Sequence, residues 1–295
     1  QTGKARTFFV EFFIINPGLG SSRPILGQHP YYRKRGMKPS YVMIKAGAFP
    51  DKNGEDGRQL HVFYPISSLQ TAGSPLVMQV STQAADEKSY SAEGIQEGTC
   101  FYSENKLTGF VSVTPGKARH RSLMTDGGYM KWELEVSKAA SCHTGILGGR
   151  LFQALHLLDS YWHGEGIRSF FRGSVILDGT SYEVTPELSY GYADKHWGRC
   201  FNNPWFQFAC GKLTSQRTGK ELRHSVLAVS GFCPRFLCFP FRRRFLLQLT
   251  YMGEDFEFTK CKWDVKETDR RFIWHILARS RNAVLKLSES YKKEE

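Results

Sequence analysis

The stretch FFRGSVILDGTSYEV, residues 170–184, decides the fold class of this chain. Two runs rich in β-formers, residues 175–177 and 182–184, lie on either side of Asp178-Gly179. Asp-Gly tolerates the positive φ angles of a tight two-residue turn, and the flanking runs favour paired strands. The stretch therefore predicts a β-hairpin.

The two-residue period of this hairpin recurs along most of the chain. Further strand-like segments, bounded by Gly, Pro, Asn or Asp, are residues 6–15, 41–49, 59–64, 108–113, 129–136, 271–278 and 283–287. A second hairpin is predicted from residues 245–251 and 256–258, with its turn near Gly253.

One stretch has helical spacing: residues 148–158, where Leu151, Leu155 and Leu158 share one stripe. Many short strands at regular spacing are typical of β-sandwiches and barrels, and 295 residues are generous for a single barrel. We therefore expect an all-β protein of two antiparallel barrel-like halves that meet near one short helix. The predicted halves are residues 1–160 and 161–295.

The composition is that of an ordinary globular protein. Hydrophobic residues make up 41% and charged residues 23%, which excludes a disordered or collagen-like chain. Lys and Arg number 40 against 28 Asp and Glu, but no nucleic-acid-binding pattern accompanies the charge, so we expect no nucleic-acid partner. The seven Cys include no Cys-x-x-Cys pair, which favours a reducing compartment and predicts a cytoplasmic location.

Part of the positive charge lies in an aromatic stretch without acidic residues, residues 222–253. Its candidate membrane-contact residues are Arg235, Phe236, Phe239, Phe241, Arg242, Arg243 and Arg244. Rings that enter the headgroup boundary beside guanidinium groups that meet phosphates suit an anionic lipid surface. An edge strand with a charged corner explains the same pattern, and both interpretations stay open.

Polar and aromatic residues are densest between residues 161 and 208. YWHGEGI at 161–167 is followed by SYGYADKHWG at 189–198 and NNPWFQF at 202–208. Asp194 lies among Tyr and Trp residues, where desolvation disfavours the charged carboxylate, so we expect this acid to keep its proton. Because aromatic faces stabilise positive charge, an acid beside them is equipped to protonate a carbon–carbon double bond.

The candidate site residues follow from this chemistry. The candidate catalytic residues are Asp194, Glu165, His163, His196 and Tyr190. The candidate substrate-binding residues are Trp162, Tyr192, Lys195, Trp197 and Trp205. The acids donate a proton, the imidazoles remove one or position water, and the rings shelter the cation. Structural roles stay open for each, including Trp rings in a core and an ion pair between Lys195 and Asp194.

Residues 189–211, SYGYADKHWGRCFNNPWFQFACG, resemble a block of the tocopherol cyclase family, Ser-Tyr-x-Glu-Lys-Asn-Trp-Gly followed by Pro-x-x-Trp-Phe. Asp194 stands at the Glu of that family, Lys195 at its Lys and His196 at its Asn. The wider group includes carotenoid 1,2-hydratase-like proteins. The resemblance implies a fold of two lipocalin-like β-barrels packed together and chemistry on a lipid double bond.

Two departures from the family motif limit what the resemblance implies. The family has a run of glycines after Trp-Gly, whereas this chain has Arg199-Cys200 at that place. The acid, Asp194, is one methylene shorter than the Glu of the family. Substrate identity therefore does not transfer to this chain.

The sequence thus predicts a cofactor-free enzyme that acts on a double bond of a hydrophobic isoprenoid or unsaturated fatty acid. Cyclisation, isomerisation and hydration stay open, because the outcome depends on what intercepts the cation. No dinucleotide fingerprint, phosphate loop or metal-ligand spacing is present, so we expect no cofactor and no metal. The expected partners are a hydrophobic small molecule and, peripherally, an anionic membrane. The alternative is a lipocalin-like carrier that leaves its lipophile unchanged.

Overall fold

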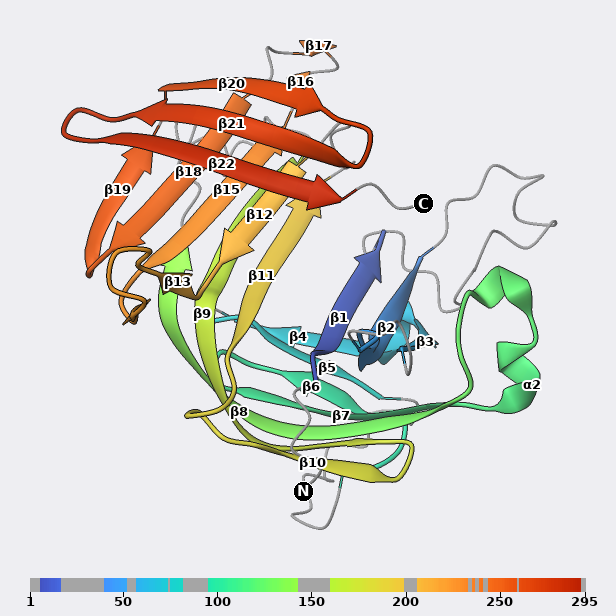
Figure 1. The fold of residues 1–295 in the computed structure, drawn as a ribbon. Coiled ribbons are helices and arrows are strands. Elements are labelled where there is room, and N and C mark those ends of the chain that lie inside the picture. Colours follow the sequence, from blue (N-terminus) through green and yellow to red (C-terminus); the bar gives the residue numbers. More distant parts are fainter. Residues whose placement is uncertain are drawn as a thin grey trace. The chain divides into compact units, whose positions relative to one another are not determined.

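The computed structural model describes residues 6–16, 40–51, 57–73, 75–81, 95–142, 160–198, 206–232, 235–236, 239–240, 244–258 and 260–292. Within these residues the fold is mainly antiparallel β-sheet with one short α-helix (Figure 1). The all-β class predicted from the two-residue period is therefore confirmed. The strands that the structure describes form no closed barrel.

The chain forms two compact units, each built from two segments. Unit 1 comprises Gln1–Val136 and Phe171–Ser189, and unit 2 comprises Ser137–Phe170 and Tyr190–Glu295. The division predicted between residues 160 and 161 falls within the first segment of unit 2. The helix predicted at residues 148–158 lies outside the described residues.

The strands that the structure describes in unit 1 belong to two sheets. The first sheet is β1 (Phe8–Ile15), β2 (Tyr41–Ala48) and β3 (Arg58–Pro65). The second includes, in sheet order, β4 (Leu69–Ala72), β5 (Val77–Val80), β6 (Cys100–Tyr102), β7 (Lys106–Val113), β8 (Gly128–Cys142), β9 (Ser160–Leu177) and β10 (Thr180–Val184). Strands β8 and β9 are long enough to run from one unit into the other. The helical turns are η2 (Ile66–Ser68), α2 (Pro115–Ala118) and η3 (Arg121–Leu123).

The hairpin that decides the fold class is confirmed. β9 and β10 pair so that only Asp178 and Gly179 lie between them. Their φ angles are 48° and 85°, as a tight hairpin turn of this kind requires. The Asp178 carboxylate also accepts a hydrogen bond from the Tyr129 backbone N–H at 2.8 Å and pairs with Arg58 Nε at 2.9 Å. These contacts fix the turn to β8 and β3.

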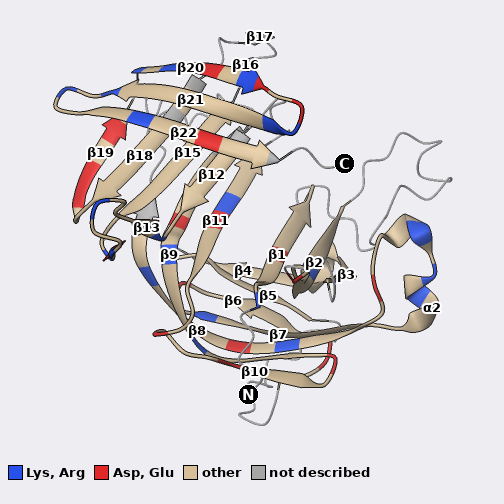
Figure 2. Ribbon diagram, in the orientation of Figure 1, with Lys and Arg blue, Asp and Glu red and all other residues tan. Residues whose placement is uncertain are grey.

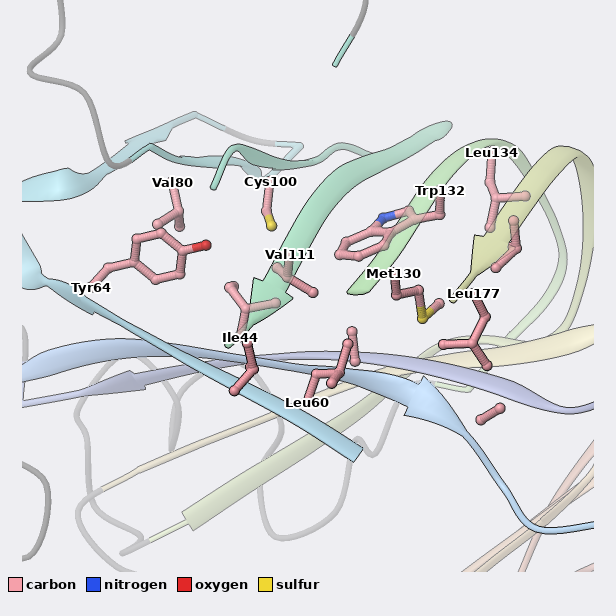
Figure 3. Packing of buried hydrophobic residues seen from close by; sticks show 14 of the residues in the cluster. Ile44, Leu60, Tyr64, Val80, Cys100, Val111, Met130, Trp132, Leu134 and Leu177 are labelled. Carbon is pink, nitrogen blue, oxygen red and sulfur yellow. The ribbon is translucent and has the colours of Figure 1, made fainter. Parts of the chain in front are cut away.

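The core of unit 1 draws side chains from both of its sheets (Figure 3). Ile44 and Leu60 from the first sheet and Val111 and Trp132 from the second are fully buried. Burial of such a side chain contributes roughly 1.5–3 kcal/mol. Gly109 lies opposite Trp132, and a Cβ at this glycine would come within 2.3 Å of the indole. Glycine is therefore required where the large ring crosses β7.

Apart from β11, the described strands that lie wholly in unit 2 form two larger sheets and two short pairs. The four-stranded sheet has the order β12 (Phe206–Cys210), β15 (Val226–Phe232), β18 (Arg244–Tyr251) and β19 (Glu254–Phe258). The three-stranded sheet is β20 (Lys260–Glu267), β21 (Arg271–Arg279) and β22 (Val284–Lys292). The short pairs are β13 (Leu213–Thr214) with β14 (Glu221–Leu222), and β16 (Arg235–Phe236) with β17 (Phe239–Pro240). Strand β11 (Gly191–Gly198) pairs with β9.

The hairpin predicted near Gly253 is also confirmed. Met252 and Gly253 form the turn between β18 and β19, with φ angles of 54° and 86°. β19 carries three acidic residues and is one of the clearly acidic strands in Figure 2.

Both faces of the four-stranded sheet of unit 2 contribute side chains to apolar cores. Leu227 and Val229 of β15 pack in a core with β21 and β22 of the three-stranded sheet. Val226 and Ala228 pack in a separate core with Trp162 of β9. Because side chains alternate along a strand, β15 supplies the two cores in turn. The two faces of the four-stranded sheet therefore belong to separate cores.

Candidate functional site

The two polar-aromatic segments singled out in the sequence are neighbouring strands. Strand β9 contains the segment YWHGEGI, and strand β11 consists of the segment GYADKHWG. In the antiparallel register Asp194 lies opposite Gly164, and His196 lies opposite Trp162. Since successive residues point to opposite faces, Asp194 and His196 share one face and Lys195 lies on the other.

Asp194 is the acceptor of a hydrogen-bond cluster on the first face. Its Oδ2 accepts from Trp162 Nε1 at 2.6 Å, from the Tyr192 hydroxyl at 2.6 Å and from Gln207 Nε2 at 3.1 Å. Gln207 Nε2 also donates to the Tyr192 hydroxyl oxygen at 2.5 Å. The cluster therefore joins β9, β11 and β12. We call Trp162, Tyr192, Asp194 and Gln207 the Asp194 cluster.

Asp194 is exposed to solvent, as is Tyr192, whereas Trp162 is buried. The expectation that this carboxyl group is desolvated is therefore wrong. A carboxyl oxygen that accepts three hydrogen bonds is suited to accept hydrogen bonds or to anchor neighbouring groups rather than to donate a proton.

His196 lies two residues after Asp194 on the same face of β11. Desolvation lowers the pKa of His196 below its ordinary value, and the Asp194 carboxylate offsets part of this shift. The imidazole is consequently neutral near pH 7, and a neutral imidazole keeps one nitrogen that can accept a proton.

Glu165 belongs to an ion-pair network on the other face. Its Oε2 lies 2.9 Å from Lys138 Nζ, and its Oε1 lies 3.1 Å from Lys195 Nζ. The Glu165 and Lys138 side chains are only 12% and 15% exposed. Lys195 Nζ also lies 5.6 Å from the centroid of the Trp197 ring. Lys195 thus pairs with Glu165, because Asp194 points to the opposite face.

The other predicted site residues are placed less closely around Asp194. His163 lies opposite Lys195 in the register of β9 and β11. Tyr190 is exposed, and its ring centroid lies 5.5 Å from Lys212 Nζ. Trp205 lies outside the described residues.

The basic aromatic stretch is described only in part. Phe241, Arg242 and Arg243 lie outside the described residues. The backbone of Arg235–Phe236 pairs with that of Phe239–Pro240, and Arg244 begins β18. Membrane contact by this stretch stays a prediction. No helix in the described ranges has the length and apolar character needed to cross a membrane.

Two arrangements of charged side chains could not be recognised in the sequence. In the first, Arg168 Nη2 lies 2.5 Å from Glu221 Oε1, and Arg168 Nη1 donates to the Arg223 carbonyl at 3.2 Å. The hydrogen bond from Arg168 is the main cause that lowers the pKa of Glu221. Lys212 Nζ lies 3.7 Å from the second Glu221 oxygen. This network connects β14 to β9, and we assign it a role in holding these two strands together.

The second arrangement is centred on Glu289 of β22. Glu289 lies opposite Trp274 and alternates in phase with Leu285 and Leu287, which pack in the core of the three-stranded sheet. Its Oε2 is buried without a hydrogen-bond partner, and desolvation raises the pKa of Glu289. The available signal was an acid at an inward position of the alternating pattern VLKLSESYK.

The described residues contain no group of three or more His, Cys, Asp or Glu side chains arranged to hold a metal ion. No family model matches the chain, and neither a curated protein nor a solved structure matches it. The likeness of residues 189–211 to the tocopherol cyclase family therefore rests on the motif alone.

Proposed function

We propose that this chain binds a hydrophobic isoprenoid or unsaturated fatty acid and moves a proton to and from its double bond without a cofactor. The observation that carries the proposal is the Asp194 cluster, with the neutral His196 on the same face. Strand β11 supplies the carboxylate, the phenol and the imidazole, and the neighbouring strand β9 supplies the indole N–H that donates to Asp194. The proposal includes membership of the tocopherol cyclase-like group and a fold of two lipocalin-like barrels.

In this proposal His196 is the base. Its neutral nitrogen takes a proton from the carbon beside the double bond, and the electron pair of that C–H bond forms the new double bond. The original π electrons then form a C–H bond at the far carbon with the proton that His196 returns. The Asp194 carboxylate stabilises the imidazolium between the two steps. The net reaction of this sequence is isomerisation. Cyclisation or hydration would require the opposite order: the imidazolium form of His196 protonates the double bond, a lipid hydroxyl or water adds to the resulting cation, and its released proton returns to His196.

The test is incubation of the protein with a panel of unsaturated lipids in D₂O, followed by mass spectrometry of the extracted lipids. We expect deuterium in at least one lipid with the native protein and a loss of about 100-fold or more in Asp194→Asn, the usual scale of acid–base catalysis. Glu254→Gln, an exposed position on β19, is the matched control. Absence of lipid conversion by the native protein across the panel would contradict the enzyme.

A second candidate, a lipocalin-like carrier, is favoured by the exposure of Asp194. Solvent at this carboxylate weakens its electrostatic effect on a reacting lipid. A carrier would bind the same lipids in native and Asp194→Asn proteins and would return them unchanged.

Location and membrane contact complete the proposal: a cytoplasmic protein whose stretch at 235–244 docks peripherally on anionic lipid. Sedimentation with vesicles tests this contact. Binding to phosphatidylglycerol vesicles should exceed binding to phosphatidylcholine vesicles and should weaken with salt. Equal binding to both would contradict it.

A further inference from the structure

The face of the three-stranded sheet that meets the core of unit 2 carries an acidic side chain, Glu289, opposite the ring of Trp274. In the antiparallel register, Glu289 of β22 is paired with Trp274 of β21, and Trp274 is paired with Val265 of β20. Glu289 is half-buried, and its Oε2 is buried without a hydrogen-bond partner. An unpaired buried acceptor destabilises the folded protein, so a hydrogen-bond donor at this oxygen would stabilise it.

Aromatic rings extend from this position to the surface. The ring centroids of Phe245 and Trp263 are 5.3 Å apart, those of Trp263 and Trp274 are 5.9 Å apart, and those of Phe245 and Trp274 are 6.3 Å apart. Trp263 is 37% exposed, so one end of the ring cluster is accessible from solvent. An apolar chain could therefore lie along surface-accessible rings while its polar end approaches the carboxyl group.

The side chains around Glu289 Oε2 indicate the charge of a ligand group that would bind there. Trp faces attract cations, and a carboxylate attracts them more strongly. An anionic headgroup would meet the Glu289 carboxyl and, farther along the same face, Glu267. A neutral hydroxyl would satisfy the acceptor but would gain nothing from the ring faces. An ammonium group supplies N–H donors and the positive charge together.

We propose that Glu289 and the rings of Phe245, Trp263 and Trp274 form a binding site for a single-chain lipophilic amine. The ammonium group donates to Glu289 Oε2, and the alkyl chain lies along the exposed part of the ring cluster. Glu289 is the anchoring residue, and no covalent step is involved.

This site is separate from the Asp194 cluster. Gln207, which donates to Asp194, alternates along β12 with Phe208, and Phe208 packs in the core that the three-stranded sheet shares. Gln207 and Phe208 therefore point to opposite faces of the four-stranded sheet. The amine site lies on the Phe208 side, so its occupation does not depend on the proposed lipid chemistry.

The test is calorimetric titration of the full chain at pH 7.5 with decylamine and decanoate below their micelle concentrations and with decanol below its solubility limit. We expect decylamine to bind at least tenfold more tightly than decanol or decanoate. Glu289→Gln should lose at least tenfold in decylamine affinity, while Glu254→Gln should retain it. Equal affinity for decylamine and decanol, or full decylamine affinity in Glu289→Gln, would overturn the proposal.

A measurement on the native protein keeps the proposal testable if Glu289→Gln folds poorly. Carbon-13 NMR of the glutamate carboxyl groups should show a resonance that titrates above the ordinary Glu range. Decylamine should shift the titration of that resonance to lower pH, because a bound cation favours the carboxylate. A resonance unmoved by decylamine would also overturn the proposal.

Discussion

Asp194 and Glu289 are both carboxyl groups beside tryptophan on strands of unit 2, yet their surroundings are opposite. Asp194 is exposed, and one of its oxygens accepts from Trp162, Tyr192 and Gln207. Glu289 has a buried oxygen with no partner and a raised pKa. Aromatic neighbours in the sequence therefore do not by themselves desolvate an acid. The two sites differ in whether neighbouring side chains donate hydrogen bonds to a carboxyl oxygen.

The largest expected effect comes from Trp162, the buried member of the Asp194 cluster. Trp162→Ala removes the indole from its core and the donor from Asp194, and we expect a loss of about 3–5 kcal/mol in the free energy of unfolding. Urea denaturation followed by circular dichroism measures this loss. Trp162→Phe keeps most of the packing and should lose about 1–2 kcal/mol. Equal losses in both variants would show that the hydrogen bond, rather than burial, dominates.

The next effect concerns Glu165, a carboxylate that is both buried and paired. Glu165→Ala leaves Lys138 and Lys195 without their common partner, and Lys138 is only 15% exposed. We expect a loss of about 2–3 kcal/mol, below the range for fully buried pairs because water reaches part of the network. Lys195→Ala, at a 40% exposed side chain, should cost less than about 1 kcal/mol in the same denaturation experiment. A larger loss of stability in Lys195→Ala than in Glu165→Ala would contradict the interpretation that Glu165 is the centre of this network.

A smaller effect is expected at Asp194 itself. Asp194→Asn should cost about 1 kcal/mol, because the charge-assisted hydrogen bonds become neutral ones in a solvated site. The same change should lower the pKa of His196 further, since the Asp194 carboxylate is the group that raises it. NMR titration of the imidazole measures this shift. An unchanged His196 titration would show that the Asp194 carboxylate has no electrostatic effect on this imidazole. It would count against the proposal that His196 is the base.

The smallest effect, with a pH-dependent sign, is expected for Glu289→Gln. Because the folded pKa of Glu289 is raised, the native protein loses stability as pH rises from the ordinary Glu value through the raised one. Glutamine does not ionise, so the variant should gain up to about 1 kcal/mol relative to native protein at pH 7.5 and nothing below the ordinary Glu pKa. Thermal unfolding at pH 4 and pH 7.5 tests the difference. The same destabilisation at both values would contradict a desolvated carboxyl group.

The local features of the fold could be predicted from the sequence because their causes are local. Asp178-Gly179 and Gly253 mark turns through their backbone preferences, and alternation marks the strands beside them. The length of β9 could not be predicted, because Gly164 and Gly166 interrupt its apolar pattern. A Cβ at Gly166 would come within 2.2 Å of Ser169 Oγ, so this glycine reflects close packing rather than a strand end. Such contacts exist only after folding.

The candidate site could be predicted in part. The clustering of Trp162, Tyr192 and Asp194 was visible as a dense polar-aromatic segment, and their strands do pair. The donor Gln207 comes from a strand of another sheet, so only tertiary structure reveals it. The exposure of Asp194 and the burial of Glu289 likewise depend on which face of a sheet is covered, and a two-residue period alone does not say which.

The interleaving of the two units sets the order in which the nascent chain can complete them. Unit 1 requires Phe171–Ser189, so it cannot close until the ribosome has passed Ser189. By then Ser137–Phe170 has already been synthesised and must wait for the rest of unit 2. The segment that carries Trp162 and Glu165 is thus exposed to aggregation during translation until its partners in unit 2 have been made.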